Sequence, residues 1–342
     1  MSQTELLTSV SVLNELGAPQ NFGWSRQPGF FYDPALVRAS RRRITESDRY
    51  IVFCPSHMVL FEIRDDGYAG YTGVSVISLT DEKRSSHHYR TLFPQGSYEM
   101  PPGSEVGAIK YRRKGITLDF APRDGGVRII RIDIPHFGRH RHLRGELVLT
   151  EPVITESLVT NMSWLGEKNA FRYSRRSPWF SIEGVIQHGT TEIVFSRGKS
   201  WGIYDWNRGV RPRADIRYWA SACGASGEHL IGFSIGYGFA ETQVCTENAF
   251  FIDGKLHKLD QVTFNIPPVD WLAPWRFTSN DNRLEMTFTP IQQRIERNRL
   301  LMYSDTRRQV CGVFSGKAIL DDGAPVEFSN ITGFAERHKT RF

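Results

Sequence analysis

The sequence predicts an all-β fold of two consecutive antiparallel β-barrel or sandwich lobes with few short helices. Aromatic residues make up 12% of the chain, and 30 glycines and 17 prolines imply many tight turns. Short alternating apolar runs bounded by turn residues recur from end to end. A length of 342 residues is enough for two lobes, each with its own core.

The N-terminal residues 1–25 contain one amphipathic piece, Leu6–Leu16. Gly17-Ala18-Pro19 follows it and is typical of a helix end. This segment is either a strap laid on the first lobe or a disordered tail. The basic run Arg41–Arg43 is either a solvated face or a binding patch.

The first predicted lobe spans residues 1–160 and is a meander of about six to eight strands. Asp65-Asp66-Gly67 and Asp124-Gly125-Gly126 are typical hairpin turns. The expected strands are Arg49–Cys54, His57–Arg64, Tyr68–Leu79, Ala108–Phe120, Val127–Ile134 and Leu143–Leu149.

The second predicted lobe spans residues 161–342, because residues 150–168 are polar, broken and without periodicity. It should carry the segment Asp205-Trp206-Asn207-Arg208-Gly209. Gln292–Met302 is either a helix or a long arm. The expected strands are Ser181–Gln187, Thr191–Ser196, Ala214–Ala222, His229–Tyr237, Ala249–Ile252, Lys255–Phe264, Trp275–Ser279, Leu284–Pro290, Gln309–Leu320 and Pro325–Ala335.

Charge and cysteine usage narrow the class of protein. The 43 basic and 37 acidic residues leave a net charge of +6, which suits anionic ligands without demanding nucleic acid. The basic clusters follow no known nucleic-acid reader pattern, so we expect no nucleic-acid partner. We expect no membrane span or secretory signal, because no apolar run nears the roughly 20 residues of a span and no basic, apolar leader is present. Four dispersed cysteines without a C-x-x-C pair fit a reducing cytosol, so we predict a cytoplasmic location.

We expect neither a metal nor another cofactor. His140 and His142 would share one face of a strand, but no carboxylate or cysteine accompanies them and the arginines of residues 139–144 would repel a cation. The sequence has no G-x-G-x-x-G fingerprint, P-loop or G-x-S-x-G elbow, so nucleotide binding and serine-hydrolase chemistry lack a motif.

The segment Lys199–Asn248 combines aromatic and ionisable residues most densely. Asp205 and Arg208 lie three apart, so in a turn the carboxylate and the guanidinium could pair. The pair is either a buried loop staple or a general acid with the arginine orienting it. The tryptophans of this segment either fill a core or line a ligand pocket; they are Trp201, Trp206 and Trp219.

Glu247 and Asn248 precede an apolar run that enters a strand. A buried glutamate needs a partner, and Arg208 or Arg211 are the candidates in this segment. Glu247 is therefore either half of a structural ion pair or a second catalytic acid. Glu336 and His338 form a similar acid–imidazole pair, which we interpret as the end of a surface strand.

With these residues in view, the chain resembles the family called domain of unknown function 2804. Asp65-Asp66-Gly67-Tyr68 carries the resemblance in the first half. The pieces in the second half are Asp205–Val210, Tyr218–Gly224, Gly232–Phe239, Thr246–Phe250, Asp253–Leu259, Pro274-Trp275, Val310–Gly316 and Gly333–Glu336.

More distantly, the two-lobed pattern and the blocks Trp201-Gly202 and Asp205-Trp206 are similar to the double-calycin group, which implies calycin- or lipocalin-like lobes. That group includes carotenoid hydratases and tocopherol cyclases. The resemblance implies a lipophilic or terpenoid-like small molecule bound in an aromatic cavity, at the opening of the second lobe or between the lobes. Cofactor-free hydratase, isomerase or cyclase chemistry would use Asp205 as the proton donor and Glu247 in reserve.

In that hypothesis Arg208 orients the acid, and the pocket residues are Trp201, Trp206, Tyr218, Trp219 and Asn248. A non-catalytic carrier with the same pocket and a structural interaction module are the alternatives. The burial of Asp205 and Arg208 separates these classes. The sequence leaves the ligand, the oligomeric state and the pathway open.

Overall fold

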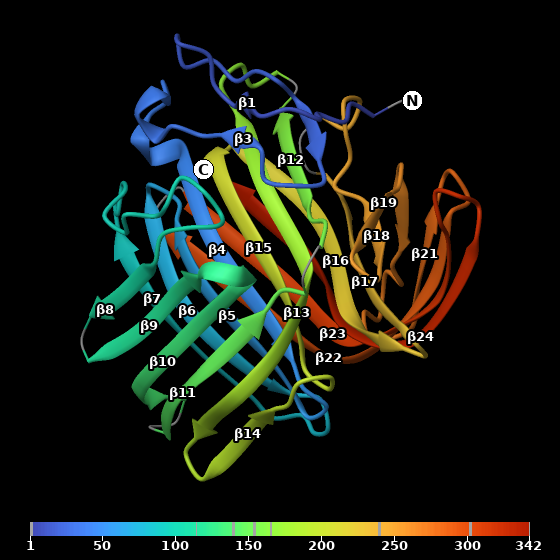
Figure 1. Cartoon of the computed structure of the whole chain (residues 1–342). Coiled ribbons are helices and arrows are strands. Elements are labelled where there is room, and N and C mark those ends of the chain that lie inside the picture. Colours follow the sequence, from blue (N-terminus) through green and yellow to red (C-terminus); the bar gives the residue numbers. More distant parts are fainter. Residues whose placement is uncertain are drawn as a thin grey trace.

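Two curled antiparallel sheets form the molecule, which confirms the predicted all-β class of two calycin-like lobes (Figure 1). A computed structural model describes residues 3–113, 115–138, 141–152, 155–164, 166–238, 241–300 and 303–341. These residues contain no α-helix; their three single-turn 3-10 helices are η1 (Pro34–Leu36), η2 (Arg41–Arg43) and η3 (Asp124–Gly126). None of the described segments is a helix long and apolar enough to cross a membrane.

The first sheet has 13 strands, in the main order β7-β6-β5-β4-β15-β13-β11-β10-β9-β8; β12 and β14 also pair with β13, and β2 pairs with β12. Their bounds are β2 (Gly23–Ser25), β4 (Ile44–Phe53), β5 (His57–Asp65), β6 (Ala69–Ser78), β7 (Arg84–Leu92), β8 (Ile109–Arg113), β9 (Ile116–Arg123), β10 (Val127–Phe137), β11 (Arg141–Thr150), β12 (Leu158–Ser163), β13 (Phe171–His188), β14 (Thr191–Phe195) and β15 (Trp201–Val210).

The second sheet has nine strands in the order β19-β18-β17-β16-β24-β23-β22-β21-β20. Their bounds are β16 (Ala214–Ser226), β17 (His229–Tyr237), β18 (Ala249–Ile252), β19 (Lys255–Lys258), β20 (Val262–Asn265), β21 (Trp275–Ser279), β22 (Leu284–Leu300), β23 (Tyr303–Ile319) and β24 (Pro325–Arg341).

The chain passes from the first sheet to the second between Val210 and Ala214. A boundary near residue 160 was predicted, but β13 and β15 lie after that point and pair with strands of the first sheet. The Asp205–Gly209 segment therefore lies in the first sheet and not in the second. The polar break at residues 150–168 is a connection within one sheet, because β11 and β12 both pair with β13.

The hairpin turn predicted at Asp65-Asp66-Gly67 joins β5 to β6, and Gly67 takes a φ of 70°, which favours glycine. The single strand predicted over residues 108–120 is instead two strands, β8 and β9, that pair with each other.

The N-terminal strap is extended, without a helix at Leu6–Leu16. Here β1 (Val10–Ser11) pairs in parallel with β3 (Phe30–Phe31). The strap is tied to both sheets, since the Thr4 amide donates to Val244 O at 3.0 Å and the Leu6 amide donates to Trp24 O at 2.8 Å.

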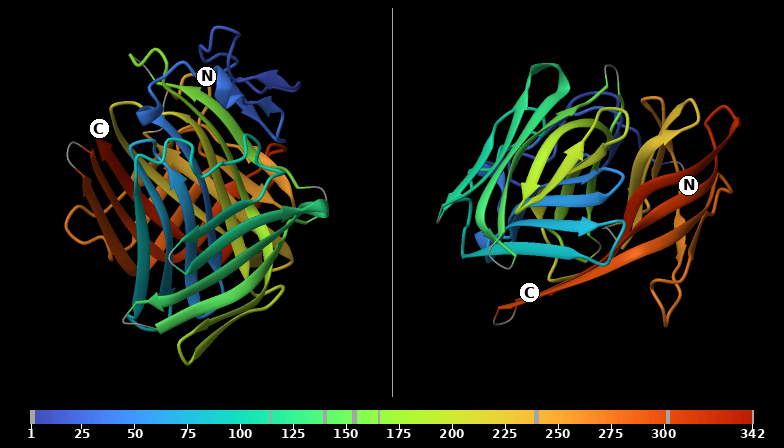
Figure 2. Two further views of the ribbon diagram at one scale, coloured as in Figure 1. Left: turned by 90° about the vertical axis from the view of Figure 1, so that its left-hand side faces the viewer. Right: turned by 90° about the horizontal axis from the view of Figure 1, so that it is seen from below.

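Of the two alternatives for Gln292–Met302, a helix or a long arm, the structure shows the long arm. Residues 301 and 302 lie outside the described residues. The hairpin of β22 and β23 reaches across the first sheet, as the view from below shows (Figure 2). Gln292 Nε2 donates to Ser78 O at 2.9 Å, and Glu296 Oε1 lies 2.7 Å from His88 Nε2. The arm therefore docks one sheet on the other.

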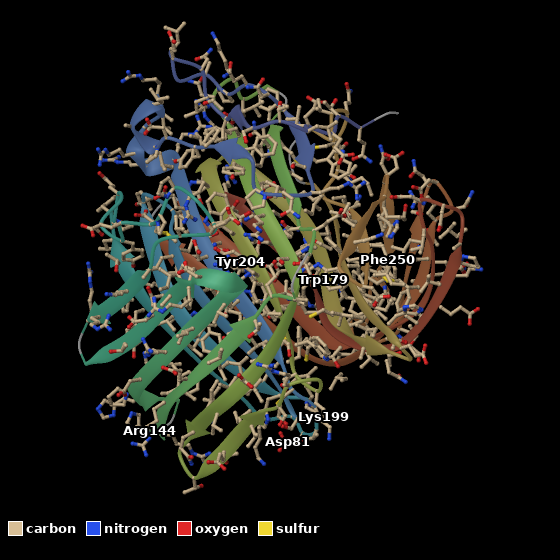
Figure 3. All side chains as sticks on the ribbon, viewed as in Figure 1. Asp81, Arg144, Trp179, Lys199, Tyr204 and Phe250 are labelled. Carbon is tan, nitrogen blue, oxygen red and sulfur yellow. The ribbon has the colours of Figure 1, made fainter. Side chains whose placement is uncertain are left out.

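Each sheet encloses an apolar core, and three further clusters of described residues lie where the sheets meet. Tyr204 belongs to the core of the first sheet and Phe250 to that of the second. Trp179 packs edge-on against Phe251 at 5.2 Å in a cluster between them (Figure 3).

Candidate functional site

The two faces of strand β15 point to different surroundings. Successive side chains of a strand alternate between faces. Trp206 lies in the core of the first sheet, as does Tyr204, whereas Ile203 belongs to the cluster between the sheets. Asp205 and Arg208 are three positions apart, so they point in opposite directions. The predicted Asp205–Arg208 pair is therefore wrong, because the segment is a strand and not a turn.

Asp205 faces the second sheet and is held by two arginines of its own sheet. Arg49 Nη2 lies 3.1 Å from Oδ2, and Arg176 Nε lies 3.3 Å from Oδ1. Burial alone would raise the pKa of Asp205, but the charges of Arg176 and Arg49 lower it to about 2. The carboxylate is therefore ionised at neutral pH.

Arg208 faces the core of the first sheet and is paired there. Its Nη2 lies 2.9 Å from Asp48 Oδ1, and Nε and Nη2 both donate to Pro101 O, at 2.9 and 2.8 Å. The guanidinium also lies over the Trp206 ring at 4.5 Å. Arg208 is thus a buried staple for the Pro101 segment.

Buried ion pairs join the two sheets across their interface. Arg49 of β4 makes a two-pronged contact with Glu336 of β24, at 3.0 and 3.1 Å. Arg307 of β23 makes the reciprocal contact with Glu62 of β5, at 2.9 and 3.1 Å. Buried pairs of this kind fix which groups face each other more than they add net stability.

A cavity lies within this charged interface, and we call it the interlobe cavity. The centre of a water molecule can occupy about 70 Å³ of it, and all the space between its walls, open solvent included, is about 790 Å³. The described residues that line it are Thr45, Ser47, Arg49, Glu62, Arg64, Asp66, Trp164, Phe171, Arg172, Arg176, Asp205, Asn207, Arg208, Arg211, Pro212, Asp215, Arg217, Trp219, Arg307, Glu336, His338 and Thr340.

Short side chains on the central strands leave this space open. Ser47 of β4 pairs in register with Asn207 of β15, and Arg64 and Ser174 flank this pair on the neighbouring strands. Thr45 lies two residues before Ser47 on the same face. The floor of the cavity is therefore made of hydroxyl and amide groups, with arginines at its sides.

His338 lines the opposite wall as a neutral imidazole. Arg217 Nη2 donates to Nδ1 at 2.9 Å, so Nε2 carries the proton and donates to Asp305 Oδ1 at 2.6 Å. Burial lowers the pKa of His338; Asp305 opposes this, and the nearby cations Arg217 and Arg307 add to it. Glu336 and His338 are 4% and 3% exposed, so interpreting them as a surface strand end was wrong.

Glu247 is buried and paired, but with arginines of β13 and not with Arg208 or Arg211 as predicted. Arg176 Nη2 lies 3.1 Å from Oε2, and Arg172 Nε lies 3.3 Å from Oε1. Both arginines line the interlobe cavity. Glu247 therefore supports the cavity wall from behind.

The predicted aromatic residues separate in the structure. Trp219 lies in the interlobe cavity wall beneath Arg176 and Arg49, at 4.2 and 4.6 Å from its ring centre. Trp206 is in the core of the first sheet, and half-buried Trp201 packs against the cluster between the sheets.

Tyr218 and Asn248 lie elsewhere, at a second cavity of about 410 Å³ in the second sheet. Asn248 lines it together with Tyr237 and Phe264. Tyr218 stacks on Tyr237 at 4.6 Å and 11°. Of the predicted pocket residues, Trp219 lines the interlobe cavity and Asn248 lines the second cavity, whereas Trp201, Trp206 and Tyr218 line neither of them.

Sequence reasoning missed most of the interlobe site. Arg49, Glu62, Arg172 and Arg307 lie on four strands that also carry other charged residues, and no spacing in the sequence connects the four. The sequence did contain one signal for these residues: they are charged, yet the alternation of their strands places them facing inward. A buried charge needs a partner, so such positions indicate a buried ion pair. None of the described residues forms a group of three or more potential metal ligands; His140 lies outside them.

Comparison with known proteins identifies the fold and the family. No curated protein matches the sequence. A protein described as AttH from Nitrosomonas europaea has a TM-score of 0.53 at 13% identity, covering 91% of this chain and 98% of its own. CghA scores 0.54 alone and 0.53 with Sch210972, each at 11% identity and covering 88% of this chain and 89% of its own.

These proteins are double-calycin-like, and at such identities the likeness shows the fold alone. The model of the family described as "Domain of unknown function (DUF2804)" matches residues 3–342. The chain therefore belongs to the DUF2804 family.

Proposed function

We propose that this protein binds a lipophilic small molecule between its two sheets, with the polar end of the molecule in the interlobe cavity. The observation that carries the proposal is a cavity between the sheets whose lining is mainly polar and charged and also includes apolar residues. Trp164, Phe171, Pro212 and Trp219 supply apolar surface in the same lining as the floor residues Ser47 and Asn207. Ligand sites typically combine apolar walls with a few convergent polar groups.

Size sets how the ligand would enter. The centre of one water molecule needs roughly 10–15 Å³ of such space, so 70 Å³ holds only about five water-sized groups. The polar end fits there, and the apolar body occupies the mouth. CghA, which shares the fold, was determined with Sch210972.

The charges favour binding over acid catalysis at this site. A general acid needs a pKa near the working pH. Asp205 has a pKa of about 2, so it holds no proton to donate at neutral pH. Its proposed role is to fix Arg49, Arg176 and the cavity floor, and the non-catalytic carrier is the better-supported class.

Native mass spectrometry of the protein purified from its own host tests the proposal. We expect a co-purifying small molecule on the wild type, lost in Ser47→Phe, which fills the floor. The matched control is Thr263→Phe, which fills the second cavity and should keep the molecule. Wild-type protein that is empty in repeated preparations would contradict the proposal. Loss in Thr263→Phe alone would place the ligand in the second cavity instead.

The comparison is valid only if the Ser47→Phe variant is folded. A cooperative thermal unfolding transition would show that it is. Thr45→Leu offers a smaller obstruction of the same floor if the larger ring prevents folding.

A further inference from the structure

Four exposed arginines surround two exposed apolar side chains at the end of strand β7. The apolar pair, Leu92 and Phe93, is 59% and 45% exposed. Neighbouring large apolar side chains on a surface indicate an interaction site, whereas single ones are normal. We call this surface the basic apolar tip, and its residues are Arg41, Arg42, Arg90, Leu92, Phe93 and Arg113.

The arginines contact the apolar pair and the chain beside it. The Arg42 guanidinium lies over the Phe93 ring, 5.7 Å from its centre. Arg41 Nη1 donates to Gln95 O at 3.3 Å. The basic run Arg41–Arg43 therefore packs against the apolar tip with its first two members.

Strand β7 and its neighbour supply the other two arginines. Arg90 lies two residues before Leu92, so the two share a face of the strand. Arg113 Nη1 donates to Thr91 Oγ1 at 3.5 Å. Cations thus approach the apolar pair from three separate segments of the chain.

The backbone holds Phe93 at the surface. Its φ of 49° is a left-handed conformation that is uncommon for residues other than glycine. The Phe93 amide donates to Tyr68 O at 3.0 Å, and the two rings pack edge-on at 5.0 Å. Backbone strain of this kind persists where the surrounding structure fixes it, and it gathers at functional sites. The fold therefore keeps an aromatic ring in water at a fixed place.

The charge of the tip is not neutralised within the protein. Across the described residues, the four arginines contact carbonyl, hydroxyl and amide oxygens or an aromatic ring and form no ion pair. Arg43, next in the same run, is by contrast paired with Glu167 at 2.8 Å. The adjoining 93–108 loop adds two exposed acids, Glu99 and Glu105. The surface therefore keeps a positive charge and fits an anionic partner.

The tip lies beside the interlobe cavity. Arg211 lines that cavity, and its Nη2 donates to Arg42 O at 2.8 Å. The hairpin turn that contributes Asp66 to the lining packs through Gly67 against the backbone of Arg41 and Arg42. A partner bound at the tip would thus lie at the same end of the first sheet as the cavity.

We infer that the basic apolar tip docks on an anionic lipid bilayer, with Leu92 and Phe93 inserted among the headgroups and the arginines on the lipid phosphates. Apolar side chains flanked by cations bind the boundary between headgroups and acyl chains, and guanidinium groups match phosphate geometry. A stable protein interface needs about 20–30 residues on each side, whereas the tip has six. This inference goes beyond the proposed function, because it names a partner and not the ligand.

Vesicle sedimentation with the full chain tests the inference. The vesicles are phosphatidylcholine alone and phosphatidylcholine mixed two to one with phosphatidylglycerol. We expect the wild type to bind the anionic vesicles about a hundredfold more strongly, since each cation near such a surface contributes roughly fivefold. The double variant Arg41→Gln/Arg42→Gln should lose about twentyfold by the same reasoning. Phe93→Ala should lose about fivefold through its apolar surface.

A matched control removes the same charge elsewhere. Arg141 and Arg144 are also exposed, and they lie at the other end of the first sheet, where β11 pairs with the end of β13 (Figure 3). Arg141→Gln/Arg144→Gln should bind both kinds of vesicle as the wild type does. Leu92→Ala probes the same tip if Phe93→Ala does not fold.

Three results would overturn the inference. Absence of binding to either kind of vesicle would leave the tip to a protein partner. Equal losses in the control and in Arg41→Gln/Arg42→Gln would show that overall charge, and not the tip, attracts the bilayer. Full binding by both Phe93→Ala and Leu92→Ala would show adsorption without insertion. None of these results bears on the proposed function, because vesicle binding is measured without the ligand and native mass spectrometry detects the ligand without vesicles.

Discussion

Both faces of strand β15 carry charged residues, but one face is packed into a filled core and the other lines a cavity. On the inner face, Arg208 is sealed between Asp48 and the Trp206 ring in a filled core. On the outer face, Asp205 and Asn207 line a cavity. Charge is neutralised on both faces, so charge is not what distinguishes them.

Side-chain length makes the difference. The inner face has large rings next to the charges; Tyr204 stacks on Tyr50 at 4.7 Å and leaves no space. The outer face has Ser47 and Asn207 at its centre, and the ion pairs that span the sheets hold their backbones apart. A buried polar region becomes a site where its central residues are short.

The largest expected effect is on the inner face. Arg208→Leu leaves Asp48 buried without its cation, and breaking a buried pair on one side costs about 3–5 kcal/mol. Urea unfolding at pH 7 measures the change. The control is Arg131→Leu, whose partner Glu146 is exposed and should matter by less than about 1 kcal/mol. Equal effects of the two variants would show that the inner face is not sealed.

A smaller loss is expected for Asp205→Asn on the outer face. The variant keeps the shape but removes the charge shared by Arg49 and Arg176, and hydrogen bonds to charged groups contribute about 1.5–3 kcal/mol. Urea unfolding again measures it, with Glu146→Gln as the exposed control. A loss as large as that of Arg208→Leu would remove the distinction between the faces.

The pH dependence isolates the same carboxylate. The pKa of Asp205 falls from its usual 3.8 to about 2 on folding, so its contribution is present above pH 5 and disappears as the pH drops toward 2. The full contribution is roughly 2 kcal/mol. The wild type should therefore lose more stability between pH 5 and pH 3 than Asp205→Asn does. Identical slopes would mean that Asp205 is not held by its arginines.

The smallest effect is expected at the cavity floor. Asn207→Ala removes two hydrogen bonds and also one unsatisfied oxygen, so the free energy of unfolding should change by less than about 1 kcal/mol. Thermal unfolding compares it with Thr45→Ala on the same floor. A loss above about 3 kcal/mol would show that Asn207 is structural and not kept for a ligand.

Local patterns in the sequence were sufficient for the strands and several turns. Alternation identified β10, and Asp-Gly signals located the turns at Gly67 and Gly254. The same patterns wrongly predicted a lobe boundary near residue 160. A polar connection between two strands of one sheet has the same composition as a connection between two lobes. Strand pairing, which is not local, decided that point.

The sequence by itself determined the all-β class, the family and the residues of segment 199–248 as ionisable groups among aromatic rings. Only the tertiary structure decided their partners. Asp205 contacts arginines of β4 and β13, and Glu336 reaches Arg49 from the other end of the chain. The physical reason is that a strand's own period sets which face a side chain takes, whereas the register of distant strands sets what that side chain meets.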